Sequence, residues 1–133
     1  MFVQVELELG ELEVLASALV RMKFDEVEVP EPYFGSPVLS VVHNRILESL
    51  IVGSRESGDE GRARRWEEWR EWAGREFERE VIISYAASLS MWDGWSRDQQ
   101  IEILGVYCSP FSVSIEDLED LRWEVDRNRR PVP

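Results

Sequence analysis

The sequence is poor in the side chains that most often carry out catalysis, with one cysteine, Cys108, and one histidine, His43. A single cysteine excludes an internal disulfide and fits a reducing compartment, so we expect a cytoplasmic protein. His43 lies next to an apolar stripe, and Cys108 lies at the end of a different predicted helix, beside Ser109 and Pro110. Packing roles are therefore favoured over a thiol and imidazole pair. Phosphate-binding glycine loops, nucleophile elbows and metal-binding histidine pairs are also absent from the sequence. We therefore predict no enzymatic activity, no cofactor and no metal site.

Long apolar runs and excess positive charge are missing as well. No apolar stretch approaches the ~20 residues that cross a bilayer, and Met1 leads into an alternating segment rather than a signal peptide. The 133 residues carry 27 acidic and 15 basic side chains, which gives a net charge of -12. Nucleic acids and anionic membranes repel such a chain, so neither is an expected direct partner. The length suits one domain over 1–133.

The start of the chain has the pattern of a minimal sheet around one helix. Apolar and polar residues alternate over 2–9, which is the period of a half-buried strand. Apolar residues at helical spacing follow over about 10–24. Val27 and Val29 then frame a short second strand that ends at Pro30. A strand, helix, strand unit would place the two strands parallel and adjacent.

The rest of the chain has the pattern of four more helices. Apolar residues recur at helical spacing, and Ser36, Ser96 and Ser114 supply N-caps. The expected spans are about 37–52, 62–92, 96–107 and 115–127, with a flexible loop over about 53–61 and a loose tail over about 128–133. The predicted fold class is mostly α, or α+β, with about five helices, a long central helix over 62–92 and a two-stranded N-terminal sheet.

The helix predicted over 62–92 is longer than a domain of this size is wide. At ~1.5 Å per residue it would extend roughly 45 Å, against a domain diameter of roughly 35 Å. It must therefore bend, with Gly74 as the candidate position, or project at one end. We expect its charged first half, 62–79, to project or to lie at the edge of the domain.

Trp72 is the candidate anchor of an interface on this helix. It lies about 120° from the apolar stripe that Trp66 defines, on the side that holds Arg65 and Arg75. Tryptophan and arginine are enriched at binding hot spots, so these residues are predicted to contact a partner or a second copy, which leaves a homodimer open. The alternative is a tryptophan covered by another element or by arginine stems.

Carboxylates gather at the start of the chain. Residues 1–31 hold eight acidic and two basic side chains, and the predicted strands place Glu6, Glu8, Glu26 and Glu28 on one small surface. Like charges side by side in a sheet are destabilising unless they are well solvated or meet positive charge. The candidates are a solvated polar face, a docking surface for a protein rich in lysine and arginine, and a divalent metal site, for which the geometry is poor.

These patterns favour a non-enzymatic acidic protein that docks on a basic surface of a partner. Basic surfaces are concentrated on proteins that handle nucleic acid, so we expect an inhibitor or modulator of a nuclease, a polymerase or a defence complex. Arginine outnumbers lysine 14 to one, and in overall style the chain resembles the small accessory proteins of bacteriophages or mobile elements. Two alternatives are an assembly subunit that oligomerises through the tryptophan-rich helix and a carboxylate-metal enzyme.

Overall fold

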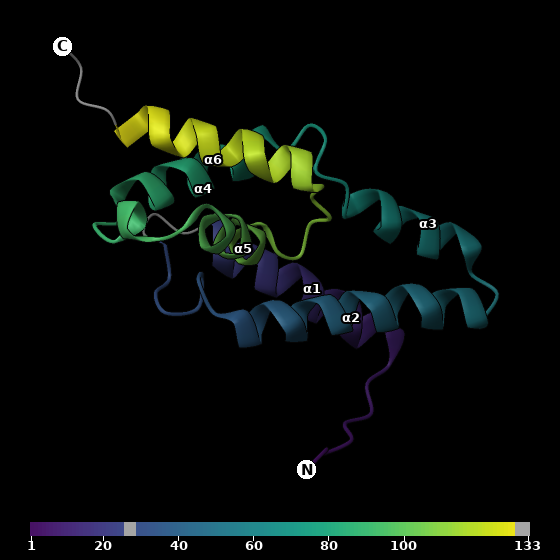
Figure 1. Ribbon diagram of the computed structural model, residues 1–133. Coiled ribbons are helices and arrows are strands. Elements are labelled where there is room, and N and C mark those ends of the chain that lie inside the picture. Colours follow the sequence, from purple (N-terminus) through teal and green to yellow (C-terminus); the bar gives the residue numbers. More distant parts are fainter. Residues whose placement is uncertain (26–28, 130–133) are drawn as a thin grey trace.

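The computed structural model describes residues 1–25 and 29–129, which form six α-helices and one short 3-10 helix (Figure 1). These are α1 (Leu9–Phe24), α2 (Pro37–Glu56), α3 (Glu60–Trp69), α4 (Glu76–Ser88), η1 (Trp92–Gly94), α5 (Arg97–Cys108) and α6 (Ile115–Arg129). The mostly α class is confirmed, whereas the five-helix count is wrong and no two-stranded sheet is found among the described residues. The helices predicted over about 10–24, 37–52, 96–107 and 115–127 are confirmed as α1, α2, α5 and α6. The tail predicted over 128–133 starts as the last turn of α6, and 130–133 lie outside the described residues.

Local capping fixes where three of the helices begin, as the sequence indicates. The Ser36 hydroxyl accepts the Leu39 N–H at 3.1 Å, and Pro37 occupies the first position of α2. The Ser96 hydroxyl accepts the Gln99 N–H at 3.2 Å, and the Gln99 side chain accepts the Ser96 N–H at 2.9 Å. The Ser114 hydroxyl accepts the Asp117 N–H at 3.1 Å at the start of α6. These bonds satisfy amides that have no partner within the helix, so α2, α5 and α6 begin where the sequence predicts.

The strand predicted over 2–9 is wrong. Residues 1–8 carry no regular secondary structure, and Leu9 already belongs to α1. The second predicted strand falls mostly on residues 26–28, which lie outside the described residues. Alternation determines which side chains share a face, but a strand forms only where a neighbouring strand satisfies its main-chain groups.

The single helix predicted over 62–92 is also wrong. The chain turns over 70–75, between α3 and α4, and a further break separates α4 from η1. Gly74 has a φ of +81°, the left-handed conformation that glycine adopts without steric cost. The turn places the Trp72 side chain in the interior. Burial of this large indole offsets the loss of the main-chain hydrogen bonds that a continuous helix would form here.

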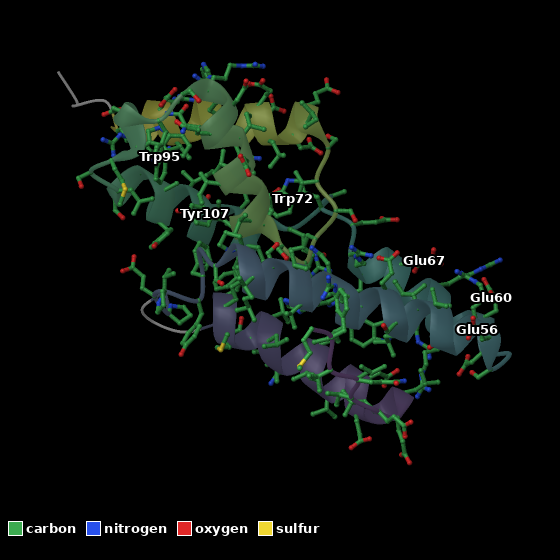
Figure 2. All side chains as sticks on the ribbon, turned by 60° about the horizontal axis from the view of Figure 1, so that its bottom comes forward. Glu56, Glu60, Glu67, Trp72, Trp95 and Tyr107 are labelled. Carbon is green, nitrogen blue, oxygen red and sulfur yellow. The ribbon has the colours of Figure 1, made fainter. Side chains whose placement is uncertain are left out.

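The structure has a short turn where a flexible loop was predicted over 53–61. Residues 57–59 alone join α2 to α3. Arg55 on α2 forms ion pairs with Glu60 at 2.8 Å and with Glu67 at 2.5 Å, both on α3 and labelled in Figure 2. These exposed pairs link the two helices across the turn and add little to stability, while the chain is helical on both sides of the three residues.

The helices form two groups that lie against each other (Figure 1). α2 packs against α1 and α3 in the first group, and α4, α5 and α6 pack together in the second. The first core contains Ala16, Leu47 and Leu50, and the second contains Trp92, Leu104 and Leu121 among others. Phe24 at the end of α1 belongs to the second core, so the two groups share part of one interior.

Candidate docking surface

Residues 1–8 expose nearly the whole of several apolar side chains. The exposed fraction is 97% for Phe2, 79% for Val3 and 74% for Val5. Glu6 and Glu8 follow in the same segment and are exposed as well. In Figure 1 this segment leaves the start of α1 and stands away from the helices. Exposed apolar side chains of this extent are typical of surfaces that bind a partner.

The structure describes two of the four carboxylates that were predicted to share one surface. Glu6 and Glu8 lie in the exposed segment, whereas Glu26 and Glu28 fall outside the described part of the chain. Across 1–25 and 29–129 there is no strand pair that would bring the two pairs together. Glu6 and Glu8 are therefore the acidic residues on which a docking surface can be built, and the shared surface stays a prediction.

Trp72 is buried, so the prediction that it is an exposed anchor is wrong. Its side chain is 8% exposed, and its ring centroid lies 6.2 Å from that of Phe111. Figure 2 shows Trp72 near the centre of the molecule, between the two groups of helices. The angular offset from Trp66 holds only for a continuous helix, and the turn over 70–75 removes it.

The two arginines predicted beside Trp72 have separate environments. The Arg75 guanidinium carbon lies 4.4 Å from the ring centroid of Phe111 and 5.4 Å from that of Trp69, and the guanidinium donates to the Trp69 carbonyl. Arg75 thus stabilises the aromatic packing beneath the turn. Arg65 is exposed on α3. It borders a shallow hollow of about 300 Å³, whose other lining residues are Glu13, Trp66 and Trp69.

The other tryptophans of this region join the helices of the first group. The Trp66 indole N–H donates to the Glu13 carboxylate on α1 at 3.2 Å, and Arg62 pairs with the same carboxylate at 2.6 Å. The Trp69 ring lies 5.2 Å from the Trp66 ring and 5.2 Å from the Phe111 ring. Trp66 and Trp69 thus pack within the fold and are only partly exposed, so little of their surface is accessible to a second copy.

Trp123 on α6 is an exposed tryptophan that the sequence interpretation missed. Its side chain is 58% exposed, and the Arg127 guanidinium carbon lies 5.3 Å from its ring centroid. Glu116 and Asp120 are exposed and precede it at helical spacing, so the four residues share the outer face of α6. The signal is present in the sequence, because Trp123 lies about 140° from Leu118 on the apolar stripe of this helix.

Four ionisable side chains lie in the interior: Lys23, His43, Tyr107 and Cys108. Lys23, the only lysine, is 5% exposed, and its ammonium donates to the carbonyls of Val106 at 2.8 Å and Ser109 at 2.7 Å. Burial lowers the pKa of Lys23 to about 7 and that of His43 to about 4, and it raises the pKa of the Cys108 thiol to about 12. His43 and Cys108 are buried as predicted, and the environment of each favours its neutral form, which suits packing.

Metal-binding clusters are not found among the described residues, where no group of three or more His, Cys, Asp or Glu side chains is arranged to hold an ion. Each described helix is too short or too polar to cross a membrane. No protein-family model, curated protein or solved structure matches the chain. The function is therefore inferred from the exposed residues themselves.

Proposed function

We propose that the protein is a non-enzymatic acidic docking protein that binds a basic surface of a partner which handles nucleic acid. The observation that supports this proposal is that exposed apolar side chains stand beside exposed carboxylates in two places. In residues 1–8 the apolar side chains adjoin Glu6 and Glu8, and on α6 Trp123 shares the outer face with Asp120.

The apolar and acidic residues of these two places would contribute in different ways. Burying an exposed large apolar side chain stabilises a contact by roughly 1.5–3 kcal/mol, and tryptophan is among the commonest hot-spot residues. Carboxylates mainly raise the association rate and select a basic surface. A net charge of -12 repels nucleic acid itself. We therefore expect this protein to contact the basic surface with which the partner binds nucleic acid. Occupying that surface would inhibit or modulate the partner.

Assembly through the tryptophan-rich region has less support than docking. Trp72 is buried, and Trp66 and Trp69 pack within the fold. Two exposed carboxylates, Glu116 and Asp120, and one guanidinium, Arg127, share the outer face of α6 with Trp123, and this excess of negative charge favours a basic partner over a second acidic copy.

The test compares variants that change the net charge equally. The whole chain captures a partner from a cell lysate, and surface plasmon resonance then measures the association rate constant at several salt concentrations. The test variant is Glu6→Gln with Glu8→Gln, and the control is Glu80→Gln with Glu102→Gln, two exposed positions on α4 and α5. We expect association of the test variant to be about threefold slower at low salt and association of the control to change less.

Trp123→Ala completes the experiment. We expect it to raise the dissociation rate constant about tenfold or more, because hot-spot tryptophans act mainly on dissociation. A partner whose association is independent of salt, or equal slowing by the test and control variants, would contradict the proposed acidic docking surface.

A further inference from the structure

Residues 2–7 have the composition and period of a β-strand but no neighbouring strand in the described chain. Phe2, Val3 and Val5 are residue types that favour strands. The main-chain groups of 2–7 form no hydrogen bond with the described residues. We propose that this segment adds as an extra strand to the exposed edge of a β-sheet in the partner, an inference that rests on the docking function proposed above.

The side-chain pattern specifies the kind of edge. In an extended chain alternate residues point to opposite faces, so Val3 and Val5 would share one face and Gln4 and Glu6 the other. The valines would extend the apolar face of the partner's sheet. Glu6 would lie beside residues of the edge strand, which proteins commonly protect with lysine. Opposite charges on neighbouring strands attract, so an edge that bears lysine is the complementary one.

A second copy of this chain fits the pattern less well. Each copy carries a net charge of -12, so two copies repel each other. A pairing that keeps the apolar faces of two such segments together also places their carboxylates together on the other face. A two-stranded ribbon is only marginally stable in water, whereas an existing sheet supplies the other strands. A basic sheet edge also supplies the counter-charge that this chain lacks.

Two contacts fix the point at which the added strand would leave the helices. The Glu11 carboxylate accepts the Glu8 N–H at 2.9 Å, which commits the donor of residue 8 to the start of α1. Leu9 packs so closely over Gly53 of α2 that a Cβ on Gly53 would lie 3.0 Å from the Leu9 side chain. The added strand therefore ends at Leu7, and the helices would take a set position beside the partner's sheet.

The test measures how proline substitutions in residues 3–6 change binding to a sheet edge of known structure. The probe is a small all-β domain of known structure whose one free edge strand carries lysine at alternate positions, and its control is the same domain with that edge closed by proline. In an added strand only alternate N–H groups bond to the neighbour, and proline has no N–H. Calorimetric titration compares the full chain with Val3→Pro, Gln4→Pro, Val5→Pro and Glu6→Pro, with alanine at each position as the side-chain control. Circular dichroism verifies that the helices are intact.

We expect proline to weaken binding at least about tenfold at alternate positions and less than about twofold at the positions between them, with no binding to the closed-edge domain. Equal losses at all four positions, binding that ignores edge closure, or no binding to the open edge would overturn strand addition. Self-association of the chain with the same alternating pattern, measured by analytical ultracentrifugation, would assign the segment to a second copy and overturn it too.

The docking function has its own readout. Slower association of the Glu6 and Glu8 variant and faster dissociation of Trp123→Ala do not depend on main-chain pairing. Strand addition can therefore fail while salt-dependent docking stands, and the two failures are distinguishable.

Discussion

Lys23 makes the stability of this protein depend on pH in a window where few other side chains titrate. The ammonium has two carbonyl acceptors, from Val106 and Ser109, and lies 5.4 Å from the Phe24 ring centroid and 5.2 Å from that of Phe34. Burial lowers the pKa of Lys23 from 10.5 to about 7 in the folded state, because the charged form loses its water.

The sign of the effect follows from proton binding. Between pH 7 and pH 10 the unfolded chain holds the Lys23 proton more strongly than the folded chain does, so the free energy of unfolding rises with pH. A folded pKa of about 7 gives a rise of about 2 kcal/mol between pH 7 and pH 9. Lys23→Met keeps most of the side-chain volume and removes the proton, so this rise should vanish.

Urea denaturation followed by circular dichroism at pH 7, 8 and 9, at constant ionic strength, measures the effect. Arg21→Met on the exposed side of α1 is the matched control and should keep the rise. The window ends at pH 9 because the pKa of Cys108, raised to about 12 by burial, makes stability fall at higher pH. A flat profile for the unaltered chain, or the same rise in Lys23→Met, would refute the reasoning.

Further predictions concern the tryptophans, the histidine and the cysteine. Trp72→Ala should lower the free energy of unfolding by about 3–5 kcal/mol because it leaves a cavity at a buried site, whereas Trp123→Ala should lower it by under about 1 kcal/mol. Urea titration measures both values, and equal losses would contradict the assigned burial. Burial lowers the pKa of His43 to about 4, so stability should fall as the pH drops from 6.5 towards 4, and His43→Gln should flatten this fall in thermal melts. An unchanged acid limb would count against that assignment. The buried Cys108 thiol should react with an aromatic disulfide reagent only as the chain unfolds, and prompt reaction under native conditions would show that the thiol is accessible.

The sequence predicted those features that depend on residues close together along the chain. Ser36 and Ser96 begin their helices through hydrogen bonds to residues three positions on, so the caps are visible in the sequence itself. The apolar stripe of α6 is equally local, and the same spacing would have identified Trp123 as an outward residue.

The features that the sequence did not predict depend on distant residues. Trp72 is buried against Phe111, and the Ser112 N–H bonds to the carbonyl of Arg70, so residues some forty positions away hold the turn that divides α3 from α4. The alternation over 2–9 is a real property of the sequence, but no strand in the described residues lies where it would pair with it. The candidate site was affected most, because its predicted geometry required both a continuous helix and a sheet.

The enclosure of the only lysine changes how the protein can be modified. The folded chain offers no lysine side chain to acetyl transfer, to conjugation with ubiquitin-like proteins or to amine-directed cross-linkers, because Lys23 is 5% exposed. Arginine, which keeps its charge and resists these reactions, carries the remaining positive charge of the side chains. Any adduct found on Lys23 would therefore record that the junction of α1 and α5 had opened, which makes amine labelling of this residue a measure of how often the fold opens there.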